Sequence, residues 1–300
     1  MASRLRLRQL RLLISLDELG SIHKAAEAMS ITQPGATKAL NEIESTLGAV
    51  LFERTSKGLE ANDLGRCVVR YARLIGNDLA HLREEMLGIL QGHGGRLSVG
   101  TIMGAVPLLT TAISRVIADH PKLSIEIVED TSAALLSQLD AGRLDLAICR
   151  TTISTTPYLY ESSTFVEETL AVIASTQHPF AYARQLSLKD LVDYRWVVYR
   201  ANMPMRLLLE REFHEADLRF PVHLLETTSA FATLSLLQEN PTLVALVSTD
   251  VAKFCSGYGF TTTLPLPITS RSEPYELVSR KNVPDSPAAR LLREALLNPV

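Results

Sequence analysis

The sequence predicts an α/β protein with an all-α head, a long linker helix and two α/β lobes. Three features predict this fold class. Apolar side chains fall at helical spacing over residues 5–47, and over residues 68–89 they recur every 3.5 residues on average. From residue 97 onward, apolar runs of strand length alternate with helical segments, as in α/β domains. At 300 residues the chain also exceeds a typical single core, so we expect two or three domains.

Composition places the chain among ordinary globular proteins and does not by itself indicate a partner. Apolar residues make up 46% of the chain, charged residues make up 21%, and the net charge is −3. Residues 1–92 carry 12 Lys and Arg against 11 Asp and Glu, so this segment is only slightly basic. A prediction of nucleic-acid binding must therefore come from the arrangement of residues rather than from net charge.

The expected location is the reducing cytoplasm. Cys67, Cys149 and Cys255 are scattered, without the spacing of disulfide or metal-binding pairs. No run of about 18 apolar residues occurs, so no membrane span is expected. The basic start, MASRLRLRQLRLLISLDELG, is interrupted by Asp17 and Glu18, and no small-residue cleavage site follows. A secretory signal is therefore not expected either.

The head is predicted to hold three helices. Leucines on one stripe form the first helix, which Gly20 ends, and an alanine-rich helix follows at residues 22–29. Thr32 caps the third helix, and Pro34 fits its first turn, where the missing N–H costs nothing. Gly48 ends the third helix. A helix, a short turn and a second helix at this spacing predict a helix-turn-helix.

A wing and a long linker helix are expected next. Residues 52–59 predict two short strands that turn at Lys57-Gly58, and Asn62 with Asp63 caps a helix that runs to about Gln91. The apolar residues of this helix have the spacing of a coiled-coil seam, and they are Val68, Ala72, Ile75, Leu79, Leu82, Met86 and Ile89. The regular spacing favours pairing with a second copy of the chain. The alternative is a helix that docks on its own domain.

Glycines at 92, 94 and 95 predict a hinge before the α/β part of the chain. Strands are expected at residues 97–101, 123–129, 144–149, 170–174, 195–199, 223–226, 243–247 and 275–279. Helices are expected at 106–119, 132–141, 205–216, 230–239, 250–256 and 286–297. The alternation predicts largely parallel sheets in two lobes. The expected domains are the head at 1–62, the linker at 63–92, lobe I at about 93–163 plus 268–300, and lobe II at about 164–267.

The segment AAEAMSITQPGATKALNEIESTLGAVLFERTSKGLEANDLG resembles the winged helix-turn-helix of LysR-type transcriptional regulators. The matching motifs are Ala25-Ala26, Thr32-Gln33-Pro34, Ile43-Glu44 with Leu47-Gly48, and Leu51-Phe52-Glu53-Arg54-Thr55. The resemblance is specific over about residues 4–65 and only architectural over 93–300, where LDAGRLDLAI, residues 139–148, looks like a stretch usual in the family. Departures at Gly35, Ala36, Lys38 and Ala39 bear on base preference rather than on the fold.

The resemblance implies that the helix from Thr32 to Glu44 enters the major groove of DNA, with its leading end at the base edges. The residues expected to contact DNA from this helix are Thr32, Gln33, Pro34, Thr37 and Lys38. Arg54 and Lys57 of the wing are expected to bind phosphate, which positions the head without reading sequence. Two alternatives stay open: Thr32 serves only as a helix cap, and Arg54 pairs with Glu42, Glu44 or Glu53.

The implied partners are double-stranded DNA of a promoter or operator and further copies of the chain. A single DNA-binding module contacts only about 600–1,000 Å². Pairing through the seam would double that contact and predicts a two-fold operator. A dimer or a tetramer is therefore expected, with RNA polymerase as a further partner and no partner in a membrane.

The two lobes resemble the type II periplasmic-binding-protein fold, with which this family senses small molecules. Ligands of such folds lie between the lobes, where strand carboxyl ends meet helix N-termini. By that logic, the residues expected to contact an effector are Thr101, Met103, Gly104, Thr131, Ser132, Arg150, Thr151, Tyr199, Asn202, Met203, Thr228, Ser229 and Ser248. These donors suit an anionic or hydroxyl-bearing metabolite. The alternative for each Ser or Thr is that it only caps its own helix.

The predicted function is sequence-specific DNA binding that regulates transcription, modulated by a small molecule, and not catalysis. Neither a nucleotide-binding glycine pattern nor a nucleophile elbow occurs, and the histidines lack metal spacing, so no catalytic residue, cofactor or metal is expected. The alternative from another class is an α/β enzyme or solute-binding module with a helical cap. Cys149 raises the question of redox sensing, but with no cysteine near it in sequence a buried hydrophobic role is favoured.

Overall fold

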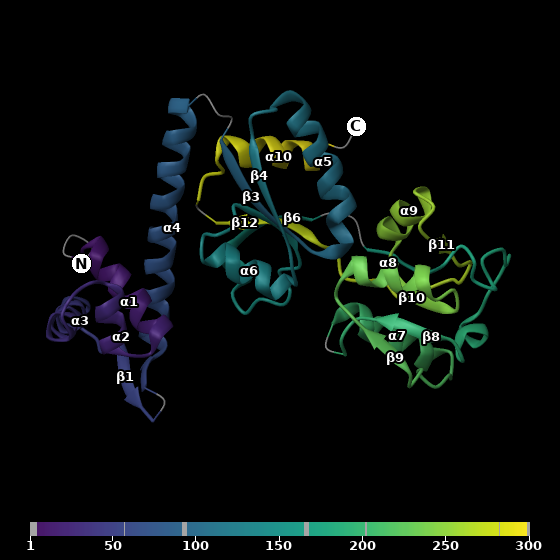
Figure 1. Cartoon of the computed structure of the whole chain (residues 1–300), viewed down its shortest axis with the longest axis horizontal. Helices are drawn as coiled ribbons and strands as arrows, with labels where there is room; N and C mark the ends of the chain where they lie inside the picture. Colours follow the sequence, from purple (N-terminus) through teal and green to yellow (C-terminus); the bar gives the residue numbers. More distant parts are fainter. Residues whose placement is uncertain are drawn as a thin grey trace.

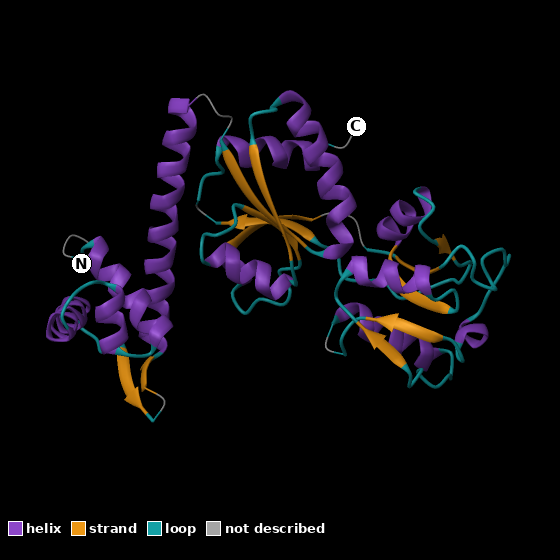
Figure 2. Cartoon of the chain, in the orientation of Figure 1, coloured by secondary structure: helices purple, strands orange, loops and turns teal. Residues whose placement is uncertain are grey.

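The computed structural model describes residues 5–56, 58–91, 95–164, 168–201, 203–281 and 283–298. Figure 1 shows the parts of the chain in a row, with the N-terminal head at one end and lobe II at the other. The long helix α4 (Asp63–Gln91) stands between the head and lobe I. Figure 2 shows that the head is helical apart from one strand pair, whereas both lobes combine helices with a central sheet.

Three helices and a strand pair build the head. They are α1 (Leu7–Leu19), α2 (Ile22–Ala28), α3 (Gln33–Leu47), β1 (Phe52–Thr55) and β2 (Gly58–Ala61). Gly20 and Gly48 end α1 and α3 in the left-handed conformation, with φ of 60° and 74°. Leucines, alanines and Ile43 from the three helices share one buried core with Phe52 and Leu59 of the strands. The predicted helix-turn-helix and wing are both present.

The wing contacts the turn between α1 and α2 at Gly20, through a backbone hydrogen bond from Leu59 and the close approach of Gly58. β1 and β2 pair antiparallel, with Thr55 opposite Gly58. The Leu59 N–H donates to the carbonyl of Gly20 at 2.8 Å. Gly58 has a φ of 127°, and a Cβ at this position would collide with the Gly20 carbonyl. The wing therefore keeps one position relative to α1 and α2.

Asn62 starts α4 in the way that the sequence predicts. Its Oδ1 accepts a hydrogen bond from the Gly65 N–H at 2.9 Å, which satisfies one of the free donors of the first turn. The helix continues for 29 residues. It is amphipathic, yet its apolar residues do not all face one neighbour.

Lobe I is a five-stranded mixed sheet covered by helices. Its elements are β3 (Arg96–Thr101), η2 (Met103–Ala105), α5 (Val106–Asp119), β4 (Ser124–Glu129), α6 (Ser132–Asp140), β5 (Leu146–Cys149), η3 (Pro157–Leu159), β6 (Tyr160–Thr164), β12 (Glu276–Arg280) and α10 (Pro287–Leu297). The strand order is β4-β3-β5-β12-β6. β3 runs parallel to β4 and β5, whereas β12 runs antiparallel to β5 and β6.

Lobe II repeats this design with its own core. Its elements are β7 (Leu170–Ala174), η4 (Leu188–Leu191), β8 (Arg195–Val198), α7 (Pro204–Glu215), β9 (Leu224–Glu226), α8 (Ala230–Glu239), β10 (Leu243–Ser248), α9 (Thr249–Gly257) and β11 (Thr262–Thr263). The strand order is β11-β7-β10-β8-β9. β8 is parallel to β9 and β10, and β7 is antiparallel to β10 and β11.

Both sheets are therefore mixed rather than largely parallel, and two strands, β6 and β11, were not expected from the sequence. The reason is the double crossing of the chain, which leaves lobe I after β6 and returns to it with β12 (Figure 1). A strand that arrives from the other lobe is free to enter the sheet antiparallel, because no helical crossover sets its direction. β6 is largely polar and β11 is two residues long, so neither has an apolar strand pattern.

Within the described residues, no helix is long and apolar enough to cross a membrane.

Candidate DNA interface and effector cleft

The leading end of α3 projects from the head with a polar, exposed face. Gln33, Pro34 and Lys38 are exposed, whereas Ala36 and Leu40 on the opposite face are buried in the head core. This division follows from the helical period, because residues three and four apart share a face. Within the first turn, Pro34 has no N–H and the Gly35 N–H donates to Thr32, so the backbone N–H of Gln33 is the one left for an anion at this end.

The two threonines of this region both bond to their own helix. Thr32 Oγ1 accepts from the Gly35 N–H at 3.3 Å, so Thr32 is a helix cap, as one of the two sequence interpretations had it. Thr37 is half-buried, and its hydroxyl donates to the Gln33 carbonyl at 3.1 Å. Thr37 therefore has little left to offer a base edge. Thr32 keeps its hydroxyl proton for a further acceptor.

Arg54 on β1 is exposed, and the described residues place no carboxylate within ion-pair distance of it. Two of the carboxylates considered from the sequence have other partners. Glu44 Oε1 accepts from the Leu51 N–H at 2.7 Å, and Glu53 accepts from the Asn62 amide at 3.3 Å. Arg54 thus remains available for phosphate. Lys57, its predicted neighbour in this role, lies outside the described residues.

A polar groove between α1 and α3 adds a candidate that the sequence reading missed. Arg6, at the start of α1, lines this groove together with Lys38 and Asn41 of α3. Arg6 was overlooked because a basic residue before a leucine-rich helix carries no motif of its own. Only the packing of α1 beside α3 places its side chain next to the exposed face of α3.

The linker helix α4 divides its surface among three environments. Near its start, Val68 is half-buried and Ala72 is 1% exposed, because α1 packs against this part of α4. Arg73 reaches Asp17 with Nη2 at 3.0 Å and pairs with Glu18 through Nη1, which ties α4 to the end of α1. Ala72 is therefore covered within the chain and is not available to a dimer seam, whereas Val68 keeps part of its surface exposed and its place in the seam stays a prediction.

Farther along α4 the apolar side chains of the predicted seam are exposed to solvent. Ile75, Leu79, Leu82 and Met86 are 40%, 43%, 53% and 54% exposed, and they occupy one stripe of the helix. The side chain of Ile89 lies outside the described residues. An apolar stripe of this length in water indicates a missing partner.

A third face of α4 contacts lobe I. The Asn77 amide donates to the Ala141 carbonyl, and Arg280 of β12 donates to Asp78 at 3.2 Å. The left-handed turn at Gly142, with φ of 67°, lies against Asn77. Because these contacts occupy the polar face, the apolar stripe points elsewhere and stays accessible. The linker is thus attached to both the head and lobe I.

A cleft of about 520 Å³ separates the lobes. Nine of the residues expected from the sequence line it, and they are Met103, Gly104, Thr131, Ser132, Arg150, Tyr199, Met203, Thr228 and Ser248. They come from the carboxyl ends of strands and the starts of helices in both lobes. The topological reasoning thus located the cleft.

Three other expected residues do not line the cleft. Thr101 is fully buried and donates to the Ile102 carbonyl at 3.0 Å. The hydroxyl of Thr151 donates to the carboxylate of Glu276 on β12, so it faces its own lobe. Ser229 caps α8 by accepting from the Ala232 N–H at 3.2 Å. Asn202 lies outside the described residues.

Several hydroxyls in the cleft also serve as caps, so the alternative interpretation holds for them in part. Thr131 accepts from the Ala134 N–H at 3.4 Å, and Ser248 accepts from the Val251 N–H at 3.3 Å. Ser132 Oγ accepts from the Arg150 N–H at 3.2 Å, which joins α6 to the end of β5. These residues line the cleft and at the same time fix its walls.

Three carboxyl side chains of the cleft were not expected from the sequence. Glu129 ends β4, Asp130 follows it, and Glu168 lies on the segment that leads into lobe II. Carboxylates at strand ends are a recognisable signal, so Glu129 and Asp130 could have been found by the reasoning that found Thr131. Glu168 follows no predicted strand and could not.

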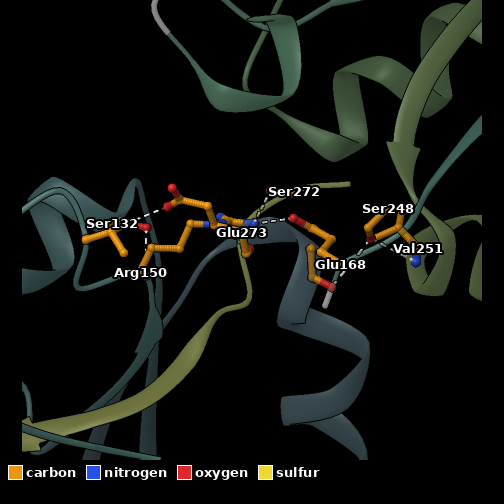
Figure 3. A network of polar contacts seen from close by, with 9 residues as sticks. Ser132, Arg150, Glu168, Ser248, Val251, Ser272 and Glu273 are labelled. Atoms are coloured by element: carbon orange, nitrogen blue, oxygen red, sulfur yellow. Dashed lines mark hydrogen bonds and ion pairs between the residues drawn. The ribbon is translucent and has the colours of Figure 1, made fainter. Parts of the chain in front are cut away.

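Arg150 and Glu168 form the centre of a buried polar network, shown in Figure 3. Arg150 Nη2 binds the Glu168 carboxylate and also donates to Ser272 Oγ at 2.8 Å, while Nε donates to the Glu273 carbonyl at 2.9 Å. Glu168 and Ser272 also pair as an isolated antiparallel bridge. Burial raises the pKa of Glu168, because desolvation outweighs the attraction of the Arg150 guanidinium. One arginine of lobe I thereby holds both segments that connect the lobes.

Two contacts hold the lobes together around Met103. The Tyr199 hydroxyl of lobe II donates to Met103 Sδ of lobe I at 3.3 Å, and burial raises the pKa of this phenol. Ser248 Oγ of lobe II lies 3.5 Å from the carbonyl of Gly104. A Cβ on Gly104 would collide with the Glu168 carboxylate, so a larger residue here would displace that side chain. A smaller apolar cavity of about 180 Å³ lies beside the cleft and shares Met103 and Glu129 with it.

Cys149, next to Arg150, is a buried thiol. It is 0% exposed, and burial raises its pKa to about 12. A thiol with this pKa is protonated at neutral pH and is a poor nucleophile. The geometry favours a role as a small hydrophobic residue of the lobe I core. Among the described residues, no group of three or more His, Cys, Asp or Glu side chains gathers in a way that could hold a metal ion.

Comparison with known proteins covers nearly the whole chain. Residues 7–66 match the family described as "Bacterial regulatory helix-turn-helix protein, lysR family", and residues 90–298 match "LysR substrate binding domain". The HTH-type transcriptional regulator GbpR of Azospirillum brasilense is 33% identical over 296 residues, covering 98% of this chain and 86% of the relative. The HTH-type transcriptional regulator YtlI of Bacillus subtilis is 29% identical over 272 residues, covering 88% and 84%.

Solved structures agree on the fold. The crystal structure of CbnR, a LysR family transcriptional regulator, matches with a TM-score of 0.64 and 20% identity over 98% of both chains. Full-length CbnR complexed with its target DNA matches with a TM-score of 0.65 and 20% identity, over 98% of this chain and 99% of that one. The matched families and relatives are regulators and not enzymes. This finding rules out the alternative that the sequence had left open, an α/β enzyme or solute-binding module with a helical cap. The chain belongs to the LysR family of bacterial transcriptional regulators.

Proposed function

We propose that this regulator binds an operator duplex as a homo-oligomer through paired heads, and that a small molecule bound between the lobes changes the spacing of those heads. The observation that carries the DNA-binding part is the exposed leading end of α3. Gln33 and Lys38 stand free of the head core beside the capped N-terminus. Side chains of these types at this end of a helix suit base edges and phosphates of the major groove.

Pairing is proposed to occur through the open part of α4, from Ile75 to Met86. Two heads on one rigid coiled coil would meet two half-sites on one side of the DNA. Assembly beyond the dimer, to a tetramer, and contact with RNA polymerase at a promoter are further parts of the proposal. The cytoplasm, where bacterial DNA lies, is the proposed location.

The effector is proposed to act on the arrangement of the heads rather than on their affinity. α4 contacts lobe I through Asn77 and Asp78, so a change in the angle between the lobes would be passed to the linker of each copy. Ligand closing the cleft should therefore change the length of the DNA footprint or the DNA bend more than the dissociation constant. An identical footprint with and without an effector would remove this mechanism.

DNA binding is tested by fluorescence anisotropy with the full-length protein. An operator is first selected from a library of random duplexes and then compared with a scrambled duplex at several salt concentrations. Arg54→Ala should weaken both complexes about equally and reduce the slope of log K against log salt by roughly one. Gln33→Ala should instead weaken operator binding by about 1–3 kcal/mol and leave the scrambled duplex unaffected. The two dissociation constants should therefore become more similar.

Arg184→Ala provides the control, because Arg184 is an exposed residue of lobe II, and lobe II lies at the opposite end of the molecule from the head (Figure 1). It should leave both affinities unchanged. A protein that binds no duplex at low ionic strength would contradict the proposed function. Loss of binding on the operator alone in Arg54→Ala would contradict the phosphate role of that residue.

A further inference from the structure

The charges of the interlobe cleft constrain what it can bind. Among the residues that the structure describes along the cleft, Arg150 is the one basic side chain, against the three carboxyl side chains of Glu129, Asp130 and Glu168. If all are ionised, the lining carries a surplus of negative charge. An anionic ligand would enter this field without a free cation to receive it.

Arg150 is already committed to protein partners. Its side chain is 9% exposed and that of Glu168 is 5% exposed, so the two charges are neutralised inside the fold. Nε and Nη2 are occupied by the Glu273 carbonyl, the Glu168 carboxylate and the Ser272 hydroxyl. Nη1 has no hydrogen-bond partner among the described residues. The arginine can thus donate one further pair of hydrogen bonds, but it offers no net charge.

The remaining groups of the cleft are mainly acceptors. Asp130 Oδ1 accepts from the Thr131 N–H at 2.7 Å and keeps its second oxygen free. Glu129 has no hydrogen-bond or ion-pair partner among the described residues, and desolvation raises its pKa. The donors that line the cleft together with these acceptors include Arg150 Nη1, the first N–H groups of α6 and the hydroxyls of Thr131, Ser132 and Thr228. A complementary ligand therefore needs many donors together with some acceptors.

We propose that the effector of this regulator is an uncharged polyhydroxyl compound, such as a sugar or sugar alcohol, and not a carboxylate. Hydroxyl groups donate to the carboxylates of Glu129, Asp130 and Glu168 and accept from Arg150 and the start of α6. An ammonium group can donate to the carboxylates, but it has no lone pair with which to accept from Arg150 Nη1, the start of α6 or the cleft hydroxyls, so it leaves these donors without partners. The proposal rests on the proposed function, in which a small molecule binds between the lobes.

The test uses ligands that share a carbon skeleton and differ in charge. Aldopentoses and aldohexoses, the matching hexuronates and the matching 2-amino sugars are screened by thermal shift on the full-length protein, and hits are measured by calorimetry. At least one neutral sugar should raise the melting temperature. Its hexuronate should bind about tenfold or more weakly, and its amino analogue should also bind more weakly.

Two variants at the cleft and one control variant far from it test whether the ligand preference comes from the cleft. Glu129→Gln removes one negative charge at nearly constant shape. It should therefore reduce, several-fold, the factor by which the neutral sugar binds more tightly than its hexuronate. Asp119→Asn removes an exposed carboxylate at the far end of α5 and should leave the ratio unchanged. Gly104→Val, which disturbs Glu168 at the cleft, should weaken all sugars.

The outcomes separate the ligand class from the binding site. If hexuronates or amino sugars bind as tightly as the neutral sugars or more tightly, or if no neutral polyol binds at millimolar concentration, the proposed ligand class is wrong. If carboxylates bind and Gly104→Val weakens them, the class fails while the cleft remains the effector site. If a sugar binds but Gly104→Val and Glu129→Gln leave its binding unchanged, the assignment of the site fails too.

Discussion

Arg150 at the end of β5 and Glu168 on the segment leading into lobe II form an ion pair whose side chains are 9% and 5% exposed. Arg150 holds Ser272 and Glu273 of the returning segment as well. The two chain segments that connect the lobes are therefore not independent of each other. The Arg150 guanidinium bonds to both of them and forms a polar cluster at the cleft.

Arg150→Met should lower the stability of the protein by about 3–5 kcal/mol, because it leaves the Glu168 carboxylate buried without a partner. The measurement is urea unfolding followed by circular dichroism. Adding Glu168→Met to this variant should recover much of the loss, since a buried apolar pair of similar volume costs little. Arg184→Met, at an exposed position, is the control and should stay within about 0.5 kcal/mol of the parent. A double variant no more stable than Arg150→Met would contradict the ion-pair account.

Leu79→Asp should dissociate the pair of linker helices. Leu79 is 43% exposed in the single chain, and an aspartate there would be buried against the partner helix in a coiled coil. Sedimentation velocity should show a species of lower mass, and operator binding should weaken with it. Ala80→Asp introduces the same acid at the next position, which is exposed and faces away from the apolar stripe, and should keep the mass of the parent. An unchanged mass for Leu79→Asp would place the pairing elsewhere.

The three cysteines should differ in reactivity in a way that excludes a thiolate switch. Cys67 is exposed, whereas Cys149 and Cys255 are buried and burial raises the pKa of both thiols. Native protein at neutral pH should react with Ellman's reagent at one thiol per chain, and unfolded protein at three. Cys67→Ser should abolish the fast reaction. Rapid modification of Cys149 in the native state would reopen its redox role.

The buried side chain of His178 should make lobe II less stable at mildly acidic pH. Its Nδ1 accepts from the Phe180 N–H at 3.0 Å, and burial lowers its pKa below the usual 6.5. The unfolded chain therefore takes up the proton at a higher pH than the folded protein does. The stability is complete above about pH 6.5 and is lost as the pH falls toward the depressed folded value.

Thermal unfolding from pH 7.5 to pH 5 tests this prediction. His178→Asn, whose side-chain oxygen can replace Nδ1 as the acceptor, should show a flatter profile than the parent. Exposed His214, at the end of α7, provides the matched variant His214→Asn, which should retain the parent profile. Equal pH dependence in all three proteins would contradict the role of His178.

Local sequence patterns were enough to predict the elements of the head and most elements of the lobes. Thr32 and Asn62 cap the helices that the sequence expected them to cap, and Gly20 and Gly48 end theirs. These features depend on a few adjacent residues, so sequence reading reaches them. The polar strand β6 and the two-residue strand β11 were missed, because their pairing is set by the path of the chain between the lobes.

The sites show the same division. Strand-end reasoning brought nine of its residues to the cleft. Thr101 is buried within lobe I, because side chains alternate between the two faces along a strand. Thr151 and Ser229 bond instead to Glu276 and to the first turn of α8. Ala72 fitted the spacing of the seam, yet it is buried within the chain. A period identifies an apolar stripe, but it does not say which neighbour covers each part.

The sequence by itself determined the order of elements, the helix-turn-helix with its wing, and the family, because these follow from spacing and short motifs. Only the tertiary structure decided that Glu168 neutralises Arg150 and that the cleft is acidic. Those two residues are brought together by the crossing of the chain between lobes, and the charge that a ligand meets is a sum over residues distant in sequence.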